Sequence, residues 1–127
     1  MPDDRHRRTV LHEAATDGDA DAVAAALASG APIDAVDYRG LTALALSAIN
    51  SNAVAAHLLL EAGANTEIAD RYGNTPLWAA VFNARGDATI VRLLREAGAD
   101  PDHVNEAGRT PRILTETIAG QEMLGFL

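Results

Sequence analysis

The most informative local pattern in this 127-residue chain is Gly73-Asn74-Thr75-Pro76-Leu77-Trp78-Ala79-Ala80. A threonine is a good helix N-cap, and a proline in the next position suits the first helical turn, where its missing N–H costs nothing. Thr75 and Pro76 therefore predict that a helix begins here. The alanines that follow are small enough to let this helix pack closely against a neighbour.

The same signals return along the chain with a period of 33 residues, and of 35 residues at the last step. The markers that share this spacing are the threonines Thr9, Thr42, Thr75 and Thr110, the glycines Gly40, Gly73 and Gly108, and the pairs Gly30-Ala31, Gly63-Ala64 and Gly98-Ala99. Several markers in one register predict a repeat architecture. The two additional residues of the third unit fall between Phe82 and Arg85.

Every period predicts the same pair of helices. A short alanine-rich helix is followed by a polar turn, such as Asp17-Gly18-Asp19, and then by a second helix with apolar pairs such as Leu58-Leu59. We expect the second helix to end at Gly30, Gly63 or Gly98, because glycine can adopt the left-handed conformation that closes a helix. One such unit buries too little apolar surface to be stable alone, so neighbouring units should stack.

The stretch around Thr75, together with Leu93-Leu94-Arg95-Glu96-Ala97-Gly98-Ala99-Asp100, resembles the ankyrin repeat. The resemblance implies an all-α solenoid, with residues 1–127 forming a single domain of four helix-turn-helix units joined by turn or hairpin loops. The units lie near residues 8–40, 41–73, 74–108 and 109–127, and the last is expected to be a C-terminal cap.

Two departures from the family's pattern carry expectations of their own. The family's histidine occurs in the first unit alone, at His12, where the resemblance implies a hydrogen bond to the hydroxyl of Thr9. Arg112 occupies the place of a core leucine in the last unit. A polar substitution at the end of the stack is what a capping repeat needs.

Composition excludes several function classes. The chain contains no cysteine and no lysine, which excludes thiolate metal sites, phosphate-loop NTPases and Schiff-base chemistry. A net charge of −8 would repel a nucleic acid, because such binding relies on cations that neutralise phosphates. No run approaches the roughly 20 apolar residues of a membrane span. We interpret the basic cluster of residues 5–8, which includes Arg8, as a solvated tail.

No catalytic constellation is predicted. The four histidines lie in separate parts of the repeats, and no nucleophile elbow or His-Glu-x-x-His pattern occurs. Asp100, Asp102 and His103 lie close in sequence but lack further ligands at metal-site spacing. We therefore expect no enzyme activity, no cofactor and no metal. A solvent-lined cleft in which these three side chains converge would reopen the enzyme hypothesis.

Binding residues are better supported, and they fall into two groups. Tyrosine and arginine, the types enriched at interface hot spots, occupy the expected loop tips at Tyr38, Arg39, Arg71 and Tyr72. The first helices are expected to present an apolar strip on the concave side, with Arg85 at its margin; its members are Leu46, Ile49 and Phe82. The alternatives are that tyrosine and arginine simply tolerate exposure, and that Phe82 folds under the inserted loop. We expect Trp78 to belong to the core.

A helical solenoid without pocket chemistry predicts a non-catalytic protein-binding module. The resemblance extends to small stand-alone bacterial ankyrin proteins, some of which are immunity partners of toxins. We therefore expect a cytoplasmic inhibitor that occludes one partner protein and is a monomer when free. The acidic charge suits a basic partner, either a toxin or an enzyme. The alternative is a general adaptor or enzyme-regulating scaffold with transient partners.

Overall fold

The computed structural model describes residues 8–119, 125 and 127, and within these residues the chain forms helices and no strands. The helices are α1 (Val10–Asp17), α2 (Ala20–Ala28), α3 (Ala43–Ile49), α4 (Ala53–Glu61), α5 (Pro76–Phe82), α6 (Thr89–Glu96) and α7 (Pro111–Leu114), followed by a π-helical turn, η1 (Thr115–Ala119). No described helix has the length and apolar character that crossing a membrane requires.

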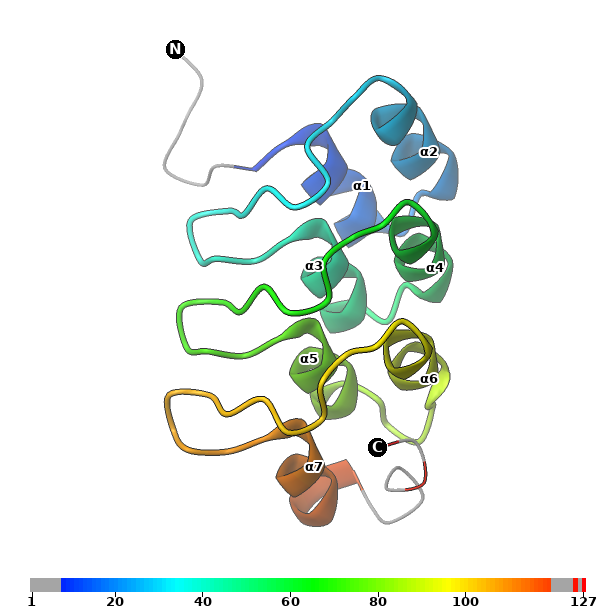
Figure 1. The fold of residues 1–127 in the computed structure, drawn as a ribbon. Coiled ribbons are helices and arrows are strands. Elements are labelled where there is room, and N and C mark those ends of the chain that lie inside the picture. The colour runs from blue at the N-terminus through cyan, green and yellow to red at the C-terminus, as the bar shows by residue number, and fades with distance from the viewer. Residues whose placement is uncertain (1–7, 120–124, 126) are drawn as a thin grey trace.

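The helices stack as two columns (Figure 1). An inner column holds α1, α3, α5 and α7, and an outer column holds α2, α4 and α6. Three loops, which we call the first, second and third fingers, project from the inner column; they comprise residues 29–42, 62–75 and 97–110. The expected all-α solenoid is confirmed.

Threonine caps begin three of the four inner helices as expected. The hydroxyl oxygens of Thr9, Thr42 and Thr110 accept the backbone N–H three residues ahead, at 3.1 to 3.3 Å. Thr75 has the same extended backbone, but its side chain makes no such bond, and its buried Oγ1 atom has no hydrogen-bond partner. The expected side-chain cap is therefore absent at Thr75, and α5 begins with the proline at its first turn.

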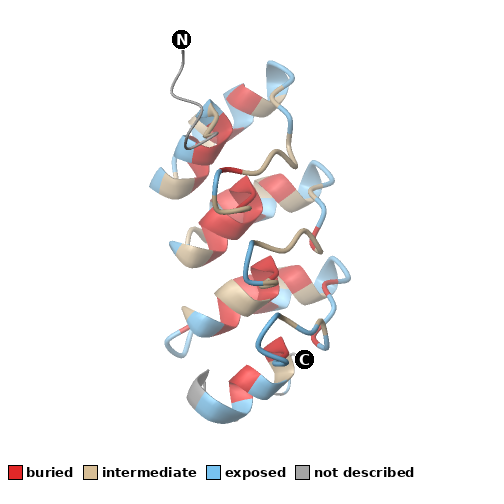
Figure 2. Cartoon of the chain, turned by 90° about the vertical axis from the view of Figure 1, so that its left-hand side faces the viewer, coloured by how far each residue is buried: buried red, intermediate tan, exposed pale blue. Residues whose placement is uncertain are grey.

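Equivalent apolar residues of neighbouring units belong to one buried core, and buried residues recur along the stacked helices (Figure 2). Leu11, Leu44 and Leu77 lie one period apart on the inner helices and are fully buried. Leu59 and Leu94, at equivalent places on the outer helices α4 and α6, are also fully buried. Full burial of a leucine side chain stabilises a fold by about 1.5–3 kcal/mol. Because these contacts join adjacent units, the stack holds together as a whole.

The fingers are joined to one another by backbone hydrogen bonds. The N–H of Arg71 donates to the carbonyl oxygen of Arg39 at 3.1 Å, and the N–H of Glu106 donates to that of Tyr72 at 3.0 Å. Gly73 makes the second approach possible: its φ is +80°, and a Cβ atom there would lie 2.9 Å from the Glu106 nitrogen. The finger tips therefore form a continuous row.

The last unit ends in polar contacts. Arg112, at the place of a core leucine, donates from Nε to Oδ1 of Asp102 at 2.8 Å and from Nη2 to Oδ2 at 3.2 Å. The guanidinium thus remains in water at the end of the stack, as a cap requires.

Candidate partner-binding face

An acidic or amide side chain shapes each finger tip in the same way. Oδ1 of Asp37 accepts the N–H groups of Arg39 and Leu41, at 2.9 and 3.0 Å. Asp70 and Asn105 make the same two bonds in the second and third fingers. A side-chain oxygen that binds backbone N–H groups further along the chain is a common device for holding a tight turn.

The tyrosines and arginines of the first two fingers form pairs at the tips. The guanidinium carbon of Arg39 lies 5.6 Å from the ring centroid of Tyr38, and that of Arg71 lies 5.3 Å from the centroid of Tyr72. Such cation–π contacts at exposed sites contribute about 0.5–1 kcal/mol. Tyr38 is 46% exposed and Tyr72 is 58% exposed. Each pair therefore presents to solvent an aromatic ring that is in contact with the neighbouring arginine.

A groove of about 290 Å³ lies between the inner helices of the second and third units. Its walls come from α3, α5 and parts of the first and second fingers. Its lining residues are Leu41, Ala45, Ile49, Asp70, Asn74, Thr75, Trp78, Ala79, Phe82 and Asn83. Asp70 and Thr75 lie where α5 begins, whereas Phe82 and Asn83 lie where it ends. The groove therefore runs along α5, from a carboxylate to an aromatic ring.

The expected apolar strip is brought together only in part. Ile49 and Phe82 both line the groove, and Phe82 is 59% exposed rather than folded under the inserted loop. Trp78 has an intermediate position: it packs against the core and also lines the groove. Its expected assignment to the core therefore describes only one side of the ring.

Leu46 does not belong to the exposed strip, and the expectation that it faces outward is wrong. It is 2% exposed and packs with Leu41 and Ala45 in a small apolar cluster. Leu41, at the end of the first finger, folds back onto α3 and so removes Leu46 from solvent. Leu114, at the equivalent place on α7, is also buried in the core.

Arg85 is exposed in the turn between α5 and α6, where its φ of +48° lies in the left-handed region. It does not line the groove. Arg85 thus follows the groove residue Asn83 by two positions without being part of the lining.

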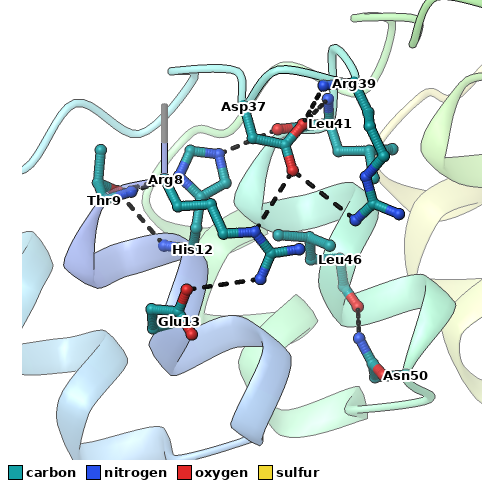
Figure 3. A network of polar contacts seen from close by, with 9 residues as sticks. All are labelled: Arg8, Thr9, His12, Glu13, Asp37, Arg39, Leu41, Leu46 and Asn50. Atoms are coloured by element: carbon teal, nitrogen blue, oxygen red, sulfur yellow. Dashed lines mark hydrogen bonds and ion pairs between the residues drawn. The ribbon is translucent and has the colours of Figure 1, made fainter. Parts of the chain in front are cut away.

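The interpretation of Arg8 as part of a solvated tail is wrong. Its Nε atom lies 3.6 Å from Oδ2 of Asp37, and its Nη1 atom lies 3.5 Å from Oε1 of Glu13 (Figure 3). Nη2 of Arg39 lies 3.8 Å from the same Asp37 oxygen, whose side chain is fully buried. A buried carboxylate requires such pairing, because desolvation of an isolated charge is costly. The remainder of the basic cluster, residues 5–7, lies outside the described residues.

Sequence reasoning did not single out Asp37 or Asp70. A signal was present, since both stand three residues before a marker glycine, Gly40 or Gly73, one period apart. The spacing does not predict that Asp37 is paired with arginines and that Asp70, among the described residues, is not. The two arginines at Asp37, Arg8 and Arg39, come from segments that lie far apart in the sequence.

Of the three neighbouring residues Asp100, Asp102 and His103, Asp102 forms an ion pair with an arginine of the last unit. Asp102 binds Arg112, and this hydrogen bond lowers the pKa of the Asp102 carboxyl below its usual value of 3.8. In the part of the chain that the structure describes, no group of three or more histidine, cysteine or acidic side chains could hold a metal ion.

Comparison with known proteins matches residues 4–105 to the family model for ankyrin repeats, in three copies. The chain is 42% identical over 88 residues to human neurogenic locus notch homolog protein 1, and 39% identical over 93 residues to an ankyrin repeat-containing protein of Treponema pallidum. It is 35% identical over 104 residues to the E3 ubiquitin-protein ligase KEG of Arabidopsis thaliana.

These matches cover 69%, 72% and 81% of this chain, but only 3%, 30% and 6% of the respective relatives. The similarity thus concerns the repeats and not the remainder of those proteins. Repeats of this kind are protein–protein interaction modules and are generally non-catalytic. The family model covers most of the chain, and the helix pairs keep one register. The chain therefore belongs to the ankyrin-repeat family.

Proposed function

We propose that this chain is a specific inhibitor that binds one partner protein through its finger tips and groove and occludes the partner's working surface. The observation that carries the proposal is the row of finger tips, in which the Tyr38–Arg39 and Arg71–Tyr72 pairs are held beside each other by a backbone hydrogen bond. Aromatic and arginine side chains fixed in advance lose little conformational entropy on binding.

The partner that the charge favours is a basic protein, either a toxin or an enzyme. A net charge of −8 attracts a basic surface and accelerates encounter. Occlusion then needs only a contact of standard size, about 800 Å² on each partner. In this proposal the chain is a monomer when free, acts in the cytoplasm, and serves as the immunity partner when the bound protein is a toxin.

The test is capture of partners by the tagged protein from lysate of its source cells, followed by measurement of affinity with the purified partner. Replacing both Tyr38 and Tyr72 by alanine should weaken binding about thirtyfold, because each ring should contribute about 1 kcal/mol. Val54→Ala is the matched control, since Val54 is 61% exposed on α4 in the outer column.

Nanomolar affinity, slow dissociation and loss of the partner's activity in the complex would support a dedicated inhibitor. Micromolar affinity with rapid exchange would instead indicate a transient adaptor. If the double tyrosine variant binds as tightly as the Val54→Ala control, the finger tips are not the binding surface.

A further inference from the structure

The inner column contains the same structural position twice, once between α1 and α3 and once between α3 and α5. The two positions are equivalent because their residues lie 33 apart in sequence. They differ in what occupies them, and this difference indicates what the open groove accepts.

At the first position, the protein supplies its own cations to a buried carboxylate. Oδ1 of Asp37 is held by backbone N–H groups, and Oδ2 faces the guanidinium groups of Arg8 and Arg39 at 3.6 and 3.8 Å (Figure 3). Arg8 reaches this carboxylate from the segment just before α1. The side chain of Arg8 therefore bridges from the start of α1 to the first finger.

At the second position, the carboxylate remains but both arginines are absent. Oδ1 of Asp70 accepts the N–H groups of Tyr72 and Asn74, at 2.9 and 3.0 Å. The residue equivalent to Arg8 is Leu41, and the residue equivalent to Arg39 is Tyr72. Among the described residues, no arginine or histidine forms an ion pair with Asp70.

The side chains that fill the first position are also replaced by smaller ones at the second. Leu41, Ala45 and Ala79 stand where the first position has an arginine, a histidine and a leucine. On the α5 side, Trp78 and Phe82 replace an alanine and an isoleucine, and they supply aromatic rings to the wall. The groove of about 290 Å³ opens at this place.

We propose that the groove binds an arginine side chain of the partner protein, which takes the place at Asp70 that Arg8 holds at Asp37. The arginine lies in a surface segment of the partner and is followed by an apolar residue that contacts Ile49 and Phe82. This inference rests on the proposed function, since it names the chemistry by which the same face recognises its partner.

Arginine fits this groove better than lysine does. Its planar guanidinium can bind a carboxylate in a fixed geometry and can stack on an aromatic face, whereas an ammonium is a compact and strongly hydrated charge. Trp78 and Asp70 both line the groove, so an indole ring and a carboxylate are available to one guanidinium.

The probe is an acetylated and amidated tetrapeptide of glycine, arginine, leucine and glycine, titrated at low ionic strength into the full chain. Trp78 is the sole tryptophan, so its fluorescence reports on the groove directly, and NMR shifts of the backbone amides locate the contact. The matched peptide carries citrulline in place of arginine, which keeps the shape of the side chain and removes its charge.

Asp70→Asn is the central variant. The third finger shows that an amide can hold the turn, because Oδ1 of Asn105 makes the same two backbone hydrogen bonds. We expect the association constant of the arginine peptide to fall about tenfold in Asp70→Asn, and to fall as much when citrulline replaces arginine. Asp17→Asn, which changes the net charge equally on the exposed surface of α1, should leave binding unchanged.

A second variant tests the space rather than the charge. Ala79→Leu restores the leucine of the first position and should abolish binding of the arginine peptide, with the unfolding midpoint measured in parallel. The inference is overturned if the arginine and citrulline peptides bind equally, if Asp70→Asn behaves as Asp17→Asn does, or if the arginine peptide produces no saturable signal. A partner protein that is lost by the double tyrosine variant but retained by Asp70→Asn would leave the proposed function standing without this inference.

Discussion

The Nε2 atom of His12 lies 3.0 Å from the carbonyl oxygen of Leu41, in the next unit of the stack. The N–H of Thr9 donates to Nδ1 of the same ring at 3.1 Å, so the tautomer with hydrogen on Nε2 satisfies both ring nitrogens. The Thr9 hydroxyl lies 3.0 Å from Nδ1, as the family resemblance implied. His12 thus ties the start of α1 to the end of the first finger.

His12→Ala should destabilise the stack by about 1–3 kcal/mol, because the carbonyl oxygen of Leu41 loses its buried donor and a cavity remains between two units. The measurement is urea unfolding followed by circular dichroism. His57→Ala provides the matched control, since His57 is exposed on α4 and its contact with Glu61 lies at the surface. Equal stability of the two variants would show that the bond to Leu41 contributes nothing.

Gly73→Ala should cost more stability than Gly63→Ala. Both glycines have a left-handed φ, of +80° and +91°, so an alanine is strained by about 1–2 kcal/mol at either position. A Cβ atom at Gly73 would additionally collide with the backbone of the third finger, whereas nothing lies within 4 Å of one at Gly63. Comparison of the two unfolding midpoints isolates the collision, and identical midpoints would contradict the close stacking of the fingers.

Leu59→Asp should unfold the stack, because it places an unpaired charge in the core between units. Val54→Asp, on the exposed side of the same helix, should remain folded. Thermal unfolding with circular dichroism separates the two outcomes. A normal melting curve for Leu59→Asp would mean that the outer helices pack in a different phase.

The Asp102–Arg112 pair should make stability depend on pH in the acid range. The hydrogen bond with Arg112 holds the pKa of Asp102 lower in the folded chain than in the unfolded one, so the pair stabilises the fold above the usual value of 3.8. This contribution is lost as the pH falls through the folded-state pKa.

The free energy of unfolding should therefore differ between the wild type and Asp102→Asn at pH 7, and the difference should shrink as the carboxyl becomes protonated. Arg112→Gln should remove the same pH-dependent difference, and the double variant should add nothing further. A difference between wild type and Asp102→Asn that grows towards acid pH would contradict the assigned direction.

Local signals in the sequence were sufficient for the helices, because caps and terminators act on their nearest neighbours. Thr42 and Thr110 cap as expected, and Gly30, Gly63 and Gly98 have the left-handed φ that closes the second helices. The capping bond of Thr75 was expected from the same pattern and is absent. A threonine hydroxyl accepts the backbone N–H three residues ahead only in a suitable side-chain rotamer, and the packing around the threonine determines which rotamer it adopts.

The repeat, the helix pairs and the stacking of units could be predicted from the sequence, since a period of 33 residues in several markers admits one register. Which outward positions stay exposed depends on the packing of the folded chain. Leu46 is covered because Leu41 folds onto α3, and Asp37 is neutralised because Arg8 and Arg39 converge on it from separate segments. Burial and ion pairing depend on how loops and side chains pack in three dimensions, whereas a repeat motif records only the local signals that form each helix pair.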